Sequence, residues 1–255
     1  MVIIENKTIA QIPTLHIVKE HLQQQKLPLI FFIHGFTSAK EHNLHFAYLL
    51  AEEGYRVILP DSLYHGERAL EGQGKELTFK FWDIVLQNIK ELSFMKEELV
   101  AQDLVDVNRI GLAGTSMGAI TMFGALTQYE WVNTAVSLMG SPHYEGFCRG
   151  LIAGIKQQGH TLPVSDQQLE RQIAELAEFD LGKQPELLKG RPILFWHGKQ
   201  DEVVPYQYTF DFYKRILPYY EGKEDQLKFI EDPKVGHKVS REALLETVEW
   251  FKTHL

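Results

Sequence analysis

Short apolar runs alternate with longer stretches of helical spacing along most of this chain. The runs are rich in Ile, Val and Phe, and several are apolar throughout, as strands buried on both faces are. They predict strands over Ile12–Val18, Leu29–His34, Arg56–Pro60, Arg109–Ala113, Thr134–Met139, Ile193–His197 and Leu227–Glu231. This alternation is typical of an α/β fold, in which helices flank a mostly parallel sheet.

The stretches between these runs predict the helices. Apolar positions three and four residues apart predict helices over Leu44–Glu53, Phe79–Val100, Ser116–Gln128, Tyr206–Leu217 and Arg241–Phe251. In the first of them, the pattern places Leu44, Tyr48 and Leu49 on one face.

Residues 141–189 depart from this rhythm. They contain no convincing strand, and apolar residues recur at helical spacing at Leu169, Ile173, Leu176 and Phe179. We therefore expect a helical insertion between two strands of the sheet, too small to form a domain of its own.

Composition limits the classes of function. The chain has 255 residues, 44% of them hydrophobic and 24% charged, which is typical of a globular protein. Its 26 Lys and Arg against 34 Asp and Glu give a net charge of −8, which argues against nucleic acid as a partner. The single cysteine, Cys148, excludes an internal disulfide and a thiolate metal cluster.

Nothing in the sequence predicts a membrane segment. The longest strongly apolar run, Leu27–Ile33, has seven residues with Pro28 inside it, whereas a spanning helix needs about 20. The first residues do not resemble a signal peptide. We expect a soluble, cytoplasmic protein without a membrane partner.

One short motif carries candidate chemistry. Gly114-Thr115-Ser116-Met117-Gly118 has the Gly-x-Ser-x-Gly pattern between a predicted strand and a predicted helix. Such a serine lies on a sharp, strained turn, and side chains at the two glycines would collide with neighbouring backbone. The alternatives are a glycine-rich turn without chemistry and a dinucleotide-binding turn, but the glycine spacing differs from G-x-G-x-x-G, and no Walker A loop occurs.

A serine nucleophile needs a base and a group that orients the base. Asp201 lies in the loop after the strand Ile193–His197, and His237 lies in the loop after the strand Leu227–Glu231. The order Ser116, Asp201, His237 is that of the α/β-hydrolase triad. Each has a simpler interpretation: Asp201 as a turn residue with Glu202 as a competing carboxylate, and His237 as a surface histidine.

The proposed triad also bears on domain organisation. Since Ser116, Asp201 and His237 must meet, the strands on both sides of the insertion share one sheet. Residues 1–255 are therefore expected to form a single domain with 141–189 as a helical lid.

The mechanism also needs two N–H groups that stabilise an oxyanion. The residue after the serine, Met117, is the first candidate donor, and Phe36, in the loop after the strand Leu29–His34, is the second. His34 is interpreted as a residue that anchors this loop.

These motifs together resemble the α/β-hydrolase superfamily, and within it the small bacterial carboxylesterases of the prolyl-oligopeptidase and dienelactone-hydrolase-like group. The stretch Pro60–Arg68 is similar to that group's loop after the fourth strand. The resemblance covers nearly the whole chain except 141–189, and it implies that this segment is a lid over Ser116. Dienelactone hydrolases have a cysteine where this chain has Ser116, and Cys148 lies in the insertion, away from the motif, so that activity is disfavoured.

Weaker signals have simpler interpretations. His65-Gly66-Glu67-Arg68 is read as a turn held by local polar contacts rather than as a site for an acidic group. His42 and His45 lack further ligands at matching spacing, so no metal is expected. The candidates for an apolar acyl site are Phe147, Leu151 and Ile155 in the insertion.

The sequence thus predicts a serine carboxylesterase that hydrolyses small to medium acyl esters through an acyl-enzyme, without a cofactor. A peptidase or amidase using the same triad is the enzyme alternative, and a non-catalytic ligand-binding relative of the fold is the third. The expected partner is a small-molecule ester, and the oligomeric state stays open.

Overall fold

The computed structural model describes residues 1–72, 74–157, 159 and 164–255. They form an eight-stranded sheet in the order β1-β2-β4-β3-β5-β6-β7-β8. The strands are β1 (Val2–Ile9), β2 (Ile12–Lys19), β3 (Leu27–Ile33), β4 (Arg56–Pro60), β5 (Val105–Thr115), β6 (Thr134–Leu138), β7 (Ile193–Gly198) and β8 (Leu227–Asp232). β2 runs antiparallel to both β1 and β4, and every pair from β4 to β8 is parallel. The predicted α/β fold is confirmed.

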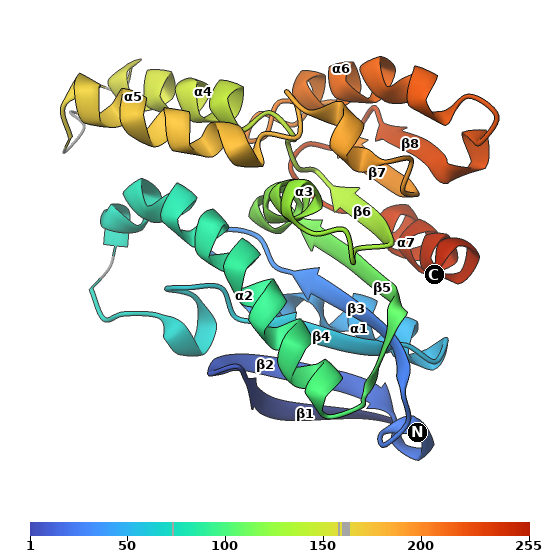
Figure 1. Cartoon of the computed structure of the whole chain (residues 1–255). Helices are drawn as coiled ribbons and strands as arrows, with labels where there is room; N and C mark the ends of the chain where they lie inside the picture. The colour runs from blue at the N-terminus through green and yellow to red at the C-terminus, as the bar shows by residue number, and fades with distance from the viewer. Residues whose placement is uncertain (73, 158, 160–163) are drawn as a thin grey trace.

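Helices cover both faces of this sheet (Figure 1). One face packs against α1 (Leu44–Glu52) and α7 (Arg241–His254), and the other packs against α2 (Phe81–Ala101), α3 (Met117–Gln128) and α6 (Tyr206–Ile216). The strands β3 to β7 therefore lie between two apolar layers, which explains why their sequences are apolar without alternation.

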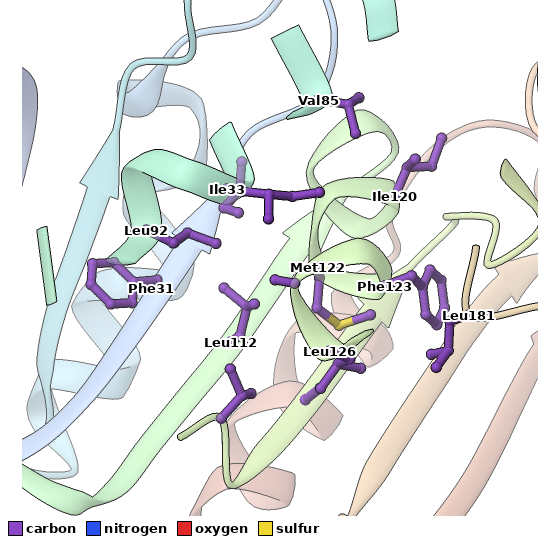
Figure 2. Close-up of a cluster of buried hydrophobic side chains, with 14 of the residues drawn as sticks. Phe31, Ile33, Val85, Leu92, Leu112, Ile120, Met122, Phe123, Leu126 and Leu181 are labelled. Atoms are coloured by element: carbon purple, nitrogen blue, oxygen red, sulfur yellow. The ribbon is translucent and has the colours of Figure 1, made fainter. Parts of the chain in front are cut away.

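The larger of the two apolar layers fixes the position of α3 (Figure 2). Phe31 on β3 and Leu112 on β5 face Leu92 of α2 and Met122 of α3, and all of these side chains are at most 1% exposed. Because α3 begins directly after Ser116, this packing determines where that serine lies.

The structure corrects two details of the sequence interpretation. The hairpin strand β1 was not predicted, because it is a largely exposed edge strand carrying Glu5, Asn6 and Lys7. Its turn residues, Ala10 and Gln11, both have positive φ without the glycine or asparagine that usually marks such a turn. On α1, the buried face is Phe46, Ala47, Leu50 and Ala51, whereas Tyr48 is 47% exposed.

The segment 141–189 contains α4 (Tyr144–Gln157) and α5 (Asp166–Glu175), followed by short 3₁₀ turns, and its described residues include no strand. The two helices extend beyond the sheet, above the start of α2 (Figure 1). Ile173 and Leu176 are buried, as their spacing predicted. Among the described residues, no helix combines the length and apolar character needed to cross a membrane.

We predict that Leu112→Ala lowers the free energy of unfolding by about 3 kcal/mol, because it leaves a cavity between β5 and the helices that pack on it. Leu245→Ala on α7, where the side chain is 40% exposed, is the control and should change it by less than about 0.5 kcal/mol. Urea titration of both variants measures the difference. Equal losses would contradict the assignment of Leu112 to the core.

Candidate active site

Ser116 lies on a strained turn between β5 and α3. Its φ is 52°, in the left-handed region that a non-glycine residue rarely occupies. A Cβ at Gly114 would lie 2.3 Å from the carbonyl carbon of Gly118, and a Cβ at Gly118 would lie 2.1 Å from the carbonyl oxygen of Ile33. Both positions therefore require glycine, and the hydroxyl of Ser116 is held above the end of the sheet.

The side chains of Ser116, His237 and Asp201 form a continuous hydrogen-bonded chain. Nε2 of His237 lies 2.8 Å from Oγ of Ser116, and Nδ1 of His237 lies 2.7 Å from Oδ2 of Asp201. Glu202, the competing carboxylate, is exposed. The side chain of His237 is 21% exposed, whereas that of Asp201 is fully buried. The hydrogen-bonded series therefore begins at a buried carboxylate.

Backbone contacts bring Asp201 and His237 together. The loop after β7 donates two hydrogen bonds to the end of β8 and the loop that follows it. The N–H of Lys199 donates to the carbonyl of Asp232, the last residue of β8, and the N–H of Gln200 donates to that of Val235. A Cβ at Gly198 would lie 2.2 Å from the carbonyl oxygen of Val235, so this close approach requires a glycine. This contact joins two segments that are distant in sequence, so no local pattern predicts it.

Asp201 accepts more hydrogen bonds than a triad requires. Oδ1 accepts from the N–H groups of Val203 and Val204, each at 2.9 Å, while Oδ2 lies 3.2 Å from Nε2 of His197. Burial acts to raise the pKa of Asp201, but the hydrogen bonds from His197, His237 and Val204 outweigh it and hold that pKa well below its ordinary value. The carboxylate is therefore ionised at neutral pH.

Two neutral histidines fix the loop that carries Phe36. Nδ1–H of His34 donates to the carbonyl of Gly35 at 2.8 Å, and its Nε2 accepts from the N–H of Ser62 at 3.0 Å. Nε2 of His65 accepts from the N–H of Thr37 at 3.0 Å. Burial lowers the pKa of His34 to about 4 and lowers that of His65 as well, so both rings stay neutral and keep these roles.

The stretch Pro60–Arg68 is held by polar contacts within the protein. Nζ of Lys40, which is 1% exposed, donates to Asp61 at 2.7 Å and to Glu67 at 2.6 Å. The guanidinium of Arg68 donates two bonds of 2.8 Å to the carboxylate of Glu91. Arg68 is thus already paired, which agrees with its interpretation as part of a turn.

The candidate oxyanion donors lie on either side of Ser116. Met117 is the first residue of α3, and Phe36 lies in the loop that directly follows β3. Within the part of the chain that the structure describes, neither backbone N–H donates a hydrogen bond to protein. Both are therefore free to bind a negative oxygen beside the serine.

Ser116 opens into a cavity of about 630 Å³ whose wall is largely apolar. α4 contributes all three residues predicted for an acyl site, Phe147, Leu151 and Ile155. The start of α2 contributes Phe81 and Trp82. The volume lies within the range of about 300–1,000 Å³ that is usual for small-molecule sites.

Cys148 lies closer to the site than its sequence position indicated. α4 folds back, and the side chain of Cys148 forms part of the wall of the same cavity as Ser116. Burial raises the pKa of its thiol to about 11, so the thiolate needed for nucleophilic attack is scarce at neutral pH. The described residues contain no group of three or more His, Cys, Asp or Glu side chains arranged to hold a metal ion.

Comparison with known proteins agrees with this geometry. The sequence profile of the prolyl oligopeptidase family (Peptidase_S9) matches residues 42–255. The chain belongs to this family. It is 51% identical to the Bacillus subtilis (strain 168) protein named "Putative esterase YitV" and 31% identical to Esterase YjfP of Escherichia coli (strain K12), in each case over the full length of both chains.

Solved structures show the same fold for this member of the prolyl oligopeptidase family. TT1662 from Thermus thermophilus superimposes with a TM-score of 0.77 at 21% identity, covering 99% of this chain and 98% of its own. The Pyrococcus furiosus esterase PF2001 superimposes with a TM-score of 0.64 at 17% identity, covering 100% of this chain and 91% of its own.

The pKa of His34 makes the stability of this family member depend on pH. The unfolded chain takes up a proton at His34 below its ordinary value of 6.5, whereas the folded protein resists protonation until about pH 4. Stability conferred by the neutral ring is therefore complete above pH 6.5 and is lost as the pH falls towards 4, by roughly 3 kcal/mol. We predict that His34→Gln reduces the acid-dependent loss of unfolding free energy by about that amount.

Urea titrations at a series of pH values measure this difference. His21→Gln, at an exposed position, is the matched control and should leave the acid dependence unchanged. An unaltered acid dependence in His34→Gln would show that His34 does not remain neutral in the folded protein.

Proposed function

We propose that this protein is a serine esterase that hydrolyses small to medium acyl esters through an acyl-enzyme. The observation that carries the proposal is the hydrogen-bonded chain from Asp201 through His237 to Ser116, which ends in an apolar cavity. Two full-length relatives whose names contain the word esterase support it.

In this mechanism, Oγ of Ser116 attacks the ester carbonyl while Nε2 of His237 accepts its proton. Asp201 accepts the Nδ1–H bond, which fixes the tautomer of the imidazole and stabilises the imidazolium that forms. The N–H groups of Phe36 and Met117 stabilise the tetrahedral oxyanion. His237 then protonates the leaving alcohol and activates the water that hydrolyses the acyl-enzyme. The substrate is a small molecule, and no step requires a cofactor.

We propose further that residues 1–255 form a single domain in which 141–189 is a lid. In this arrangement α4 and α5 cover the cavity, and the wall that contains Phe147, Leu151 and Ile155 binds the acyl group. The lid thereby excludes water from one side of the reacting carbonyl and restricts the length of the acyl chain.

We predict that Ser116→Ala lowers kcat/KM for a nitrophenyl ester by at least about 10⁴-fold, because the nucleophile is lost while the cavity remains. Asp201→Asn should lower it by a similar factor, since the amide no longer selects the reactive imidazole tautomer. Ser93→Ala on α2, where the hydroxyl donates to Glu97 and the residue does not line the cavity, is the control and should retain full activity. Undiminished hydrolysis by Ser116→Ala would refute the proposed nucleophile.

The same triad can cleave amides, and the family includes peptidases, so ester and amide substrates must be compared. The pig acylamino-acid-releasing enzyme is 23% identical, but the match covers only 32% of its length. We expect turnover of an acyl nitrophenyl ester to exceed that of the acyl-matched nitroanilide. A preference for the anilide would assign the protein to the amidases.

The apolar wall gives a prediction for acyl chain length. Each methylene buried in the cavity contributes about 0.8 kcal/mol, so kcat/KM should rise up to about fourfold per carbon until the cavity is full. We predict a maximum at short to medium chains, and Leu151→Trp, which narrows the cavity, should move the maximum to shorter chains. Arg171→Trp is a control on the exposed surface of α5 and should leave it unchanged. A maximum at long chains in the unaltered protein would contradict a restrictive lid.

A further inference from the structure

His197 is a fully buried histidine at the end of β7 that the triad mechanism does not use. Its Nε2 lies 2.9 Å from the carbonyl oxygen of Val204 and 3.2 Å from Oδ2 of Asp201. A carbonyl oxygen only accepts hydrogen bonds, so Nε2 carries the proton. Nε2–H therefore donates to the carbonyl of Val204, and Oδ2 of Asp201 lies beside the same nitrogen.

His197 contacts Asp201 in two ways. Its Nε2 lies beside Oδ2, and its N–H holds Val204, whose own N–H donates to Oδ1. Oδ2 accepts from Nδ1–H of His237, and Oδ1 accepts from the N–H of Val203 as well. Because both oxygens are held, the plane of the carboxylate is fixed.

Packing alone does not account for an imidazole at this position. Nδ1 of His197 is buried, and it has no hydrogen-bond partner among the described residues. A buried polar atom without a partner destabilises the folded state, and an apolar side chain of similar size would avoid that loss. What the imidazole supplies and a leucine cannot is Nε2–H, which holds the Val204 carbonyl beside Asp201.

We propose that His197 is a positioning residue that holds the carboxylate of Asp201 in the orientation in which it orients His237. The inference rests on the proposed function, since the orientation matters for the triad reaction. Among the described residues, two titratable side chains contact the ring of His197. Oδ2 of Asp201 lies 3.2 Å from Nε2, and the ring centroid of Tyr206, whose hydroxyl is bonded to Glu231, lies 5.8 Å away. Asp201 is thus the charged group in direct contact with His197.

Removal of this N–H has two consequences. The carboxylate gains freedom to rotate, so the imidazole of His237 spends less time aligned with Ser116, and kcat falls. Oδ2 also loses the polar neighbour that it has besides His237, and it accepts more strongly from the imidazolium that forms during the reaction. His197 itself does not line the cavity, although Val204 does, so we expect substrate binding to change much less than kcat.

The test compares His197→Leu, which removes the donor, with His197→Gln, whose side-chain amide can replace Nε2–H. For His197→Leu we expect kcat to fall about tenfold, KM to stay within about twofold, and the acid limb of the kcat/KM profile to move to higher pH. For His197→Gln we expect most of the lost kcat to return. His197→Asn has a shorter amide than His197→Gln and should behave like His197→Leu. It therefore shows whether the loss comes from the missing donor rather than from an apolar side chain.

His16→Leu is the control for loss of a buried histidine, since His16 is equally buried but lies on β2, at the other end of the sheet. It should change the melting temperature without moving the acid limb. The proton resonance of the His237–Asp201 hydrogen bond, observed by NMR without substrate, should shift in His197→Leu and return towards its original position in His197→Gln.

The inference is overturned if His197→Leu retains the kcat, the acid limb and the proton resonance of the unaltered protein. It is also overturned if His197→Gln loses as much kcat as His197→Leu while both remain folded. Failure of the proposed function itself gives a different result, because the unaltered protein would then hydrolyse no ester, while the proton resonance would still report on the contact.

Discussion

The site depends on the contact between the start of α3 and the end of β3. Ser116 keeps a φ of 52° because α3 lies against the backbone of β3, close enough that a Cβ at Gly118 would meet the carbonyl oxygen of Ile33 at 2.1 Å. The loop that carries Phe36 begins at the next residue, His34. One close approach of two backbones therefore places Ser116, the proposed nucleophile, and Phe36, a candidate oxyanion donor, at the same end of the sheet. The apolar core shown in Figure 2 holds this arrangement in place.

Features that depend on local sequence were predictable. The central strands are buried on both faces, so their uninterrupted apolar runs identify them, and β4 (Arg56–Pro60) matches its predicted bounds. Gly114 and Gly118 follow from the geometry of the turn itself. The antiparallel strand β1 has neither an apolar run nor a glycine turn, because it is a largely exposed edge strand whose turn is made by Ala10 and Gln11. Helix spacing also identified α1 but not its buried face, which tertiary packing selects.

Features that depend on contacts between distant loops were not predictable. The order of Ser116, Asp201 and His237 indicated that they meet, but it gave no sign that Gly198 packs against Val235 or that His197 lies against Asp201. The same holds for His65, whose ring reaches Thr37 across 28 residues of sequence. Cys148 seemed remote from the motif only because the return of α4 over the cavity is a property of the fold. Where tertiary contacts determine the role of a side chain, the neighbouring sequence does not predict that role.

We propose that Ser116 carries the acyl group during turnover. Peptide mapping by mass spectrometry tests this after the protein has reacted with a fluorophosphonate probe, which forms a stable adduct with an activated serine. We expect one adduct, on the peptide that contains Ser116, and none in His237→Ala, because the hydroxyl is then no longer activated. An adduct confined to another residue, or none in the unaltered protein, would contradict it.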